Sequence, residues 1–187
     1  MAILKKNSLL ILLLAVFGVA FCLISLPNHY NFRTYSLDLG MFNNAIYDFS
    51  KFRNNMYTLG VMDRNVNYFY DHFAPITILF APFRFLGTSG LLIAQILSIL
   101  MGGLGVFKYA TLRSKSSWLP YLAITYFFLH WGVANALSFD FHTNVIAAML
   151  VPWLFVAFYQ KKWKLFALMI VLLLISKENI GLWVFFI

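Results

Sequence analysis

Long runs of apolar residues dominate the chain, and polar residues collect in the segments between them. The first run, residues 8–27, would form a helix that matches the roughly 30 Å hydrocarbon core of a bilayer. A shorter run at 73–86 contains Pro75, Pro82 and Arg84, so a re-entrant or interfacial segment is predicted there. The pattern as a whole predicts about five membrane-spanning helices, at 8–27, 89–107, 118–137, 143–159 and 165–187.

The composition agrees with this pattern. The 187 residues are 62% hydrophobic and 11% charged, with a mean hydropathy of +0.80, far from an ordinary soluble domain. The class indicated is an all-α polytopic membrane protein, with residues 1–187 forming a single membrane domain in contact with the lipid bilayer. A nucleic-acid partner is not predicted despite the net charge of +8, because Lys and Arg are spread over short loops. Nothing in the sequence specifies an oligomeric state.

The distribution of charge sets the predicted orientation. Cytoplasmic loops of membrane proteins carry an excess of Lys and Arg. With the N-terminus inside and 73–86 not counted as a span, the basic loops "KYATLRSK" and "QKKWK" both face the cytoplasm. All of the six acids then face outward. This assignment predicts a long first outer loop at 28–71.

The outer loop contains a candidate amphipathic surface helix over 36–52. Its apolar positions recur at helical spacing and form one stripe, made of Phe42, Ala45, Ile46, Phe49 and Phe52. Asp38 falls within the stripe and points toward the protein body or the headgroup boundary. An alternative is that Asp38 caps the helix.

Further titratable residues are assigned to the same membrane face. Asp71 and His72 stand where the chain re-enters the membrane, and Asp140 and His142 stand in the outer turn "SFDFH". Lys177 and Glu178 interrupt the last apolar run, where a charged side chain costs about 2.5–3.5 kcal/mol near a helix centre. A continuous helix through this run would put both in the outer third of the membrane. Hydrated interfacial pairs, or a self-neutralised Lys177 and Glu178, are the non-functional alternatives.

Four stretches occur in a recognisable order: "DLGMFNNAIY", "YDHFAPITILFAPF", "FDFHTNVIAAMLVPW" and "LLISKENIG". In this order they resemble the marks of a bacterial and archaeal membrane family, the domain of unknown function 2079. That family is similar to a remote branch of the GT-C glycosyltransferases. The resemblance implies a GT-C-like N-terminal part, and because GT-C proteins have roughly twice as many spans or more, a truncated product is expected.

The resemblance also implies an activity and roles for residues. A GT-C-like enzyme would transfer a sugar from a polyprenyl phosphate carrier to an unknown acceptor on the outer face of a bacterial cytoplasmic membrane. Asp38 would be the catalytic base, and Lys177 would neutralise the lipid phosphate. The substrate-binding candidates are His72, Asp71, Asp140, His142, Lys177 and Glu178. No cofactor is predicted, and nothing in the sequence specifies a divalent metal, although some of the superfamily hold one.

Other classes of function stay open. Charged residues inside a span also mark the coupling sites of transporters and ion-coupled carriers, which predict broken spans near the membrane midplane. A non-catalytic membrane subunit or a truncated remnant is the third alternative, and it predicts scattered polar groups rather than convergent ones.

Overall fold

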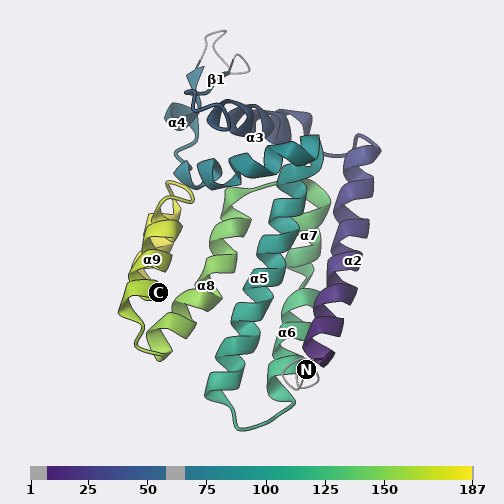
Figure 1. Cartoon of the computed structure of the whole chain (residues 1–187), viewed down its shortest axis with the longest axis vertical. Coiled ribbons are helices and arrows are strands. Elements are labelled where there is room, and N and C mark those ends of the chain that lie inside the picture. Colours follow the sequence, from purple (N-terminus) through teal and green to yellow (C-terminus); the bar gives the residue numbers. More distant parts are fainter. Residues whose placement is uncertain (1–7, 58–65, 187) are drawn as a thin grey trace.

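The computed structural model describes residues 8–57 and 66–186, which form a helical bundle with a layer of helices across one end (Figure 1). Its elements are α2 (Ser8–Tyr30), α3 (Ser36–Phe49), β1 (Met56–Tyr57), β2 (Val66–Asn67), α4 (Tyr68–Asp71), η1 (Pro75–Ser89), α5 (Gly90–Arg113), α6 (Leu119–Leu129), α7 (Trp131–Phe139), α8 (Thr143–Tyr159), α9 (Trp163–Leu174) and α10 (Ile180–Phe185). The two short strands pair in antiparallel fashion.

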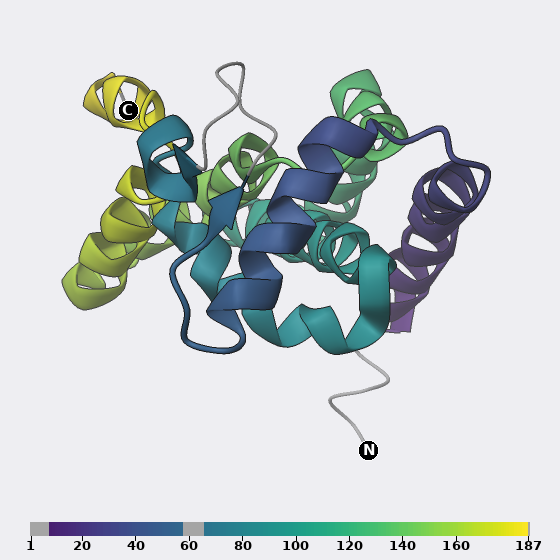
Figure 2. The ribbon, with the colours of Figure 1, turned by 90° about the horizontal axis from the view of Figure 1, so that it is seen from above.

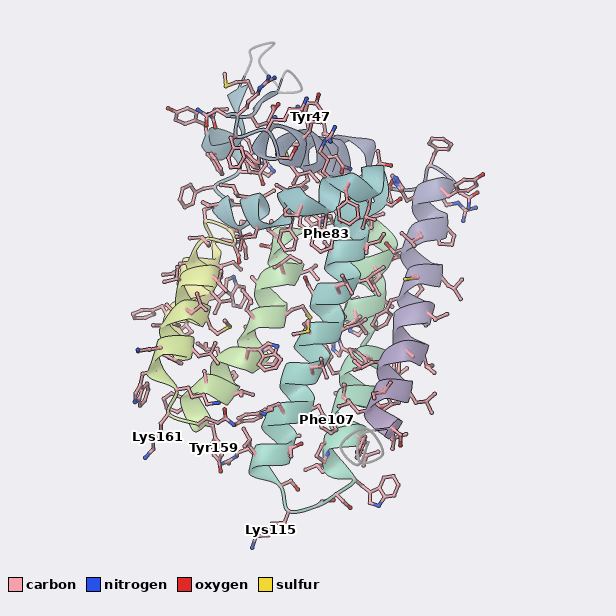
Figure 3. All side chains as sticks on the ribbon, viewed as in Figure 1. Tyr47, Phe83, Phe107, Lys115, Tyr159 and Lys161 are labelled. Atoms are coloured by element: carbon pink, nitrogen blue, oxygen red, sulfur yellow. The ribbon has the colours of Figure 1, made fainter. Side chains whose placement is uncertain are left out.

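The long helices run alongside one another, and α5 packs against α2, α6 and α8 (Figure 1). Helix α3 and the 3-10 helix η1 pack together and lie across one end of this bundle, as the view from above shows (Figure 2). Lys115 and Lys161 lie at the opposite end, away from Tyr47 (Figure 3). The two basic loops therefore share one end, which is the arrangement that the charge analysis requires. The N-terminal lysines, Lys5 and Lys6, lie outside the described residues.

The helices confirm the predicted class, an all-α membrane protein. Two stretches are long and apolar enough to cross a bilayer: α2, and Pro75–Arg113, in which η1 joins α5 and the backbone is non-helical at Gly87. A third span is formed if α6 and α7, which meet at an angle of 43°, are taken together. The apolar helices α8 and α9 are shorter, at 17 and 12 residues. The count of five spans stays a prediction.

Close helix contacts explain the stretch "MGGLG" in α5. A Cβ atom on Gly103 would lie 2.3 Å from the ring of Phe128, and one on Gly102 would lie 2.6 Å from the sulfur of Met149. Small residues let neighbouring membrane helices approach closely. The glycines therefore allow α6 and α8 to pack closely on α5.

The apolar stripe predicted for α3 is correct except at its end. Phe42, Ala45 and Ile46 are buried, and they pack on residues from η1, α5 and the α7–α8 turn. Phe52, in contrast, is fully exposed with a φ of 56°. The helix stops at Phe49 because the N–H groups of the following residues bond back to its last carbonyl groups in a turn. The stripe therefore faces protein.

The prediction of one continuous helix over 165–187 is wrong. Helix α9 ends at Leu174 and α10 begins at Ile180, so the "SKEN" residues form an irregular link. The carbonyl of Ile175 accepts a hydrogen bond from the backbone N–H of Ile76 at 3.0 Å. A carbonyl group that the break leaves without a helical partner thus accepts a hydrogen bond from η1. This bond joins the break to the layer of α3 and η1 across the end of the bundle.

Candidate functional site

Helix α3 carries Asp38 and Phe42 one turn apart, on the same face. The residue at the N-cap position is Tyr35, with no side-chain cap, and Asp38 lies in the first helical turn. The alternative in which Asp38 caps the helix is therefore wrong. A carboxylate in a first turn is still favoured by the positive end of the helix dipole. Asp38 is half-buried, whereas Phe42 is 4% exposed.

Two histidines from distant segments meet at Phe42. The ring centroid of Phe42 lies 6.3 Å from that of His72 and 6.2 Å from that of His142, with both pairs near edge-to-face. His72 follows the short helix α4, and His142 is the N-cap residue of α8. The structure thus brings together two predicted site residues that are 70 positions apart in sequence.

His142 is paired with a buried carboxylate. Its Nδ1 atom lies 2.7 Å from Oδ1 of Asp140, and the Asp140 side chain is 0% exposed against 31% for His142. The other carboxylate oxygen, Oδ2, is buried without a hydrogen-bond donor among the described residues. A buried carboxylate beside one ring nitrogen fixes the orientation of an imidazole and leaves the other nitrogen for a ligand.

Burial raises the pKa of the Asp140 carboxyl above its ordinary value of 3.8. His142 lowers this pKa through a hydrogen bond and its charge, and the negative charge of Asp38 raises it. Asp140 and His142 therefore form one interacting pair, and the charge of Asp38 on α3 has the smallest of these effects.

Gln95, on α5, holds this pair in place and was not identified from the sequence. Its Nε2 donates to the carbonyl of Asp140 at 2.6 Å and to that of Ala136 at 3.2 Å, and its Oε1 accepts from the N–H of His142 at 2.8 Å. Gln95 is 1% exposed. An amide side chain within an apolar run is the signal that could have found it, because such residues usually bond between helices.

A buried tyrosine, Tyr68, packs against His72 and bonds to η1. The Tyr68 ring lies 6.2 Å from the His72 ring, and its hydroxyl is 2.9 Å from the Thr77 hydroxyl. Burial raises the pKa of Tyr68 to about 12; the Thr77 hydrogen bond opposes this and the charge of Glu178 adds to it. The "SKEN" link lies at this end of the bundle because the residue before it, Ile175, is bonded to Ile76 of η1.

The remaining predicted residues are less closely engaged. Lys177 is half-buried and Glu178 is exposed. Within the described part of the chain, neither forms an ion pair, so the self-neutralised pair is not formed there. Asp71 ends α4, and its side chain lies outside what the structure describes. Among the described residues, no three His, Cys, Asp or Glu side chains are grouped so that they could hold a metal ion.

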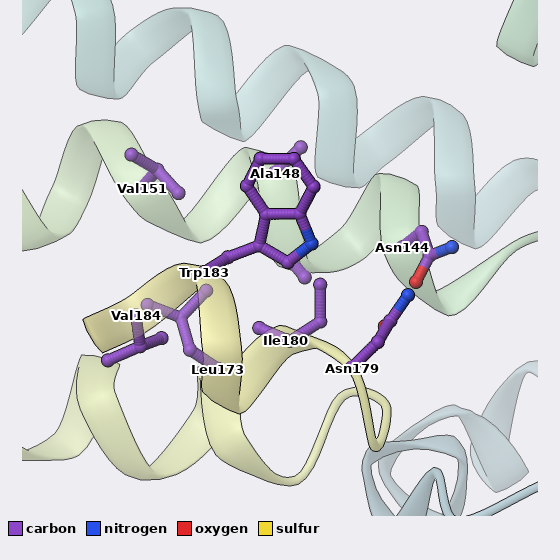
Figure 4. A pocket seen from close by; sticks show the side chains of 9 residues that line it. Asn144, Ala148, Val151, Leu173, Asn179, Ile180, Trp183 and Val184 are labelled. Carbon is purple, nitrogen blue, oxygen red and sulfur yellow. The ribbon is translucent and has the colours of Figure 1, made fainter. Parts of the chain in front are cut away.

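A pocket of about 370 Å³ lies next to the polar residues, between α8 and α10. Figure 4 shows Asn144 and Asn179 at one end of it and Val151 and Val184 toward the other. Asn144 is two residues after His142, and Asn179 directly follows Glu178. The polar end of the pocket is therefore formed by residues that are close in the sequence to titratable ones, and the rest of the pocket is lined by apolar residues.

Together, the apolar helices and the polar residues at one end define an integral membrane protein with a candidate site under a layer of helices. The sequence model of the family described as "predicted membrane protein (DUF2079)" matches residues 28–187, and the chain belongs to this family. No curated protein and no solved structure matches the chain. The family predicted from the four ordered stretches of the sequence is thereby confirmed.

Proposed function

We propose that this protein is a GT-C-like glycosyltransferase, which moves a sugar from a polyprenyl phosphate carrier to an acceptor hydroxyl at the outer face of a bacterial cytoplasmic membrane. The observation that carries the proposal is the grouping of His72 and His142 around Phe42 at one end of an apolar bundle, with Asp140 paired to His142 and Asp38 one helical turn from Phe42 on α3. A non-catalytic subunit would have no need to assemble titratable groups from three distant segments.

In the proposed reaction, the Asp38 carboxylate accepts the proton of the acceptor hydroxyl. The acceptor oxygen forms a bond to the anomeric carbon of the sugar as the bond from that carbon to the carrier phosphate oxygen breaks. The carrier leaves as polyprenyl phosphate with the bonding electron pair. Lys177, half-buried at the helix break, would neutralise the negative charge of the phosphate.

His142 has a positioning role in this proposal. Asp140 orients its ring through Nδ1, so that Nε2 is left to bind a hydroxyl of the sugar or the acceptor. His72, on the other side of Phe42, would bind the same substrate.

The test uses the full chain in phospholipid vesicles supplied with radiolabelled polyprenyl phosphate sugars and cell-envelope lipid as acceptor. Loss of a general base typically costs 10²–10⁴-fold in rate, so Asp38→Asn should slow transfer by at least about 100-fold. Asp48→Asn is the matched control, because Asp48 is on the same helix and its carboxylate accepts from Asn55 at 2.8 Å instead. Transfer by Asp38→Asn at the parent rate would remove Asp38 from the reaction.

A second candidate, an ion-coupled carrier, is favoured by one observation. Both α6–α7 and α9–α10 are broken, and discontinuous helices line the binding sites of many transporters. This alternative predicts solute movement across vesicles that depends on an ion gradient. The glycosyltransferase predicts transfer in vesicles without any gradient, so one preparation separates the two.

A further inference from the structure

We propose that the pocket between α8 and α10 binds a neutral lipid alcohol, a hydrocarbon chain that ends in a hydroxyl group. This inference goes beyond the proposed function because it concerns binding alone and holds whether or not a sugar is transferred. Three features of the pocket carry it: an acceptor atom without a donor, a lining without charge, and a position beside exposed apolar surface.

The acceptor atom is Oδ1 of Asn144. It is buried, and within the described residues it has no hydrogen-bond donor. A buried polar atom without a partner costs about 1–3 kcal/mol, so a ligand that supplies a donor at this point is stabilised. A hydroxyl group supplies that donor, and it also accepts from an amide such as that of Asn179, which lies at the same end of the pocket as Asn144 (Figure 4).

The rest of the lining selects an uncharged, apolar ligand. Beyond the two asparagines, every lining residue is apolar: Ala147, Ala148, Val151, Leu173, Ile180, Trp183 and Val184. A phosphate or carboxylate head placed here would lose its hydration without a cation among the lining residues. The amide end therefore fits a neutral head, and the apolar end fits a hydrocarbon chain.

The surroundings identify the source of the ligand as the bilayer. On α10, Leu182 is 68% exposed and Phe185 is 82% exposed, and Trp183, which lines the pocket, is 65% exposed. In an integral membrane protein such apolar surface faces lipid. A ligand from the bilayer reaches the pocket without crossing water, and its head then lies at the end formed by Asn144 and Asn179.

The experiment uses the full chain in phosphatidylcholine vesicles with a hexadecanol that carries a photoreactive diazirine on its chain. After irradiation, mass spectrometry of the peptides locates the label. We expect labelling within 147–151 and 180–184, competed by unlabelled hexadecanol at concentrations about tenfold lower than by hexadecane, because hexadecane lacks the hydroxyl. Hexadecyl phosphate should compete more weakly than hexadecanol.

Two variants refine the test. Ala148→Trp fills the pocket and should abolish labelling at both segments, whereas Ala134→Trp, at an exposed position on α7, should leave it unchanged. Asn144→Ala should weaken competition by hexadecanol about tenfold and leave that by hexadecane unaltered. Competition by hexadecanol, hexadecane and hexadecyl phosphate is measured on the parent protein. It therefore tests the proposal even if a substitution prevents folding.

Several outcomes would overturn the proposal. Label spread evenly over the lipid-facing helices would mean that the pocket has no preference for the probe. Equal competition by hexadecane and hexadecanol would remove the role of the amides, and stronger competition by hexadecyl phosphate would replace the neutral head with an anionic one. None of these outcomes depends on sugar transfer, so failure here is distinguishable from failure of the proposed enzyme activity.

Discussion

The backbone N–H of His142 donates to Oε1 of Gln95 at 2.8 Å, while Nε2 of the same amide binds the carbonyl of Asp140 at 2.6 Å. One buried side chain near the start of α5 thus fixes the backbone on both sides of Phe141, which is itself fully buried. The positions of the Asp140 carboxylate and the His142 ring follow from this single residue of α5.

The first prediction concerns that amide. Gln95→Leu keeps a similar volume but leaves the backbone groups of Asp140 and His142 without their partner, so we expect a loss of about 2–4 kcal/mol in the free energy of unfolding. Unfolding of the purified protein by titration with a denaturing detergent measures it. Ser98→Ala, on the same helix, is the control, because Ser98 only bonds to the carbonyl of Ala94 in its own helix. Equal stabilities for the two variants would contradict the role of Gln95.

The second prediction compares two glycines. Gly103→Ala places a methyl group against the Phe128 ring, so we expect destabilisation of about 1–3 kcal/mol, the usual cost of overpacking. Gly40→Ala has nothing within 4 Å of its added Cβ, and in a helix it should stabilise the protein by about 0.5–1 kcal/mol. The shift in melting temperature should therefore have opposite signs in the two variants. Stabilisation by Gly103→Ala would show that contact with α6 does not limit this position, and destabilisation by Gly40→Ala would show that the space around its Cβ is not free.

Hydrophobic patterning predicted the class and most helices, because burial and bilayer thickness act on long stretches of sequence. It could not predict the break at 175–179. That break depends on the hydrogen bond from Ile76 to Ile175, between residues 99 positions apart, which no local pattern contains. The exposed position of Phe52 was missed for a related reason, since a turn one residue earlier ends the helix although the spacing continues.

The candidate site was predicted only in part. Residue type marked Asp38, His72, Asp140 and His142, because titratable side chains are costly near a membrane. Their grouping around Phe42 needs the tertiary fold. Gln95 and Tyr68 were not selected because an amide or a phenol beside apolar residues looks like ordinary packing until its partners are known.

The third prediction concerns Tyr68 at alkaline pH. Its pKa is raised from 10.0 to about 12, so the folded state keeps the phenol proton where the unfolded state loses it. The stabilising contribution is complete below pH 10 and is lost as the pH rises toward 12, by roughly 2–3 kcal/mol in total. Tyr68→Phe should remove this part of the alkaline decline in stability. The other residues titrate in both proteins. Curves of stability against pH that run parallel for parent and Tyr68→Phe would therefore show that Tyr68 is not the group responsible.

The fourth prediction concerns Asp140 at acidic pH. Its pKa is raised chiefly by burial, so the folded state binds the proton more tightly than the unfolded state. Its contribution to stability is therefore complete below the ordinary value of 3.8 and is lost as the pH rises through the raised pKa. Lowering the pH from about 7 toward 4 should raise the melting temperature of the parent relative to Asp140→Asn, which lacks the titrating group.

Two further variants make the assignment to Asp140 specific. His142 lowers the pKa of Asp140, so His142→Gln should move the same gain in stability to a higher pH. Asp48→Asn, which removes a different carboxylate, one bonded to Asn55, is the control variant measured beside it. If His142→Gln and the parent had the same acid profile, the contact between His142 and Asp140 would not be coupled to protonation, and His142 would lose its proposed positioning partner.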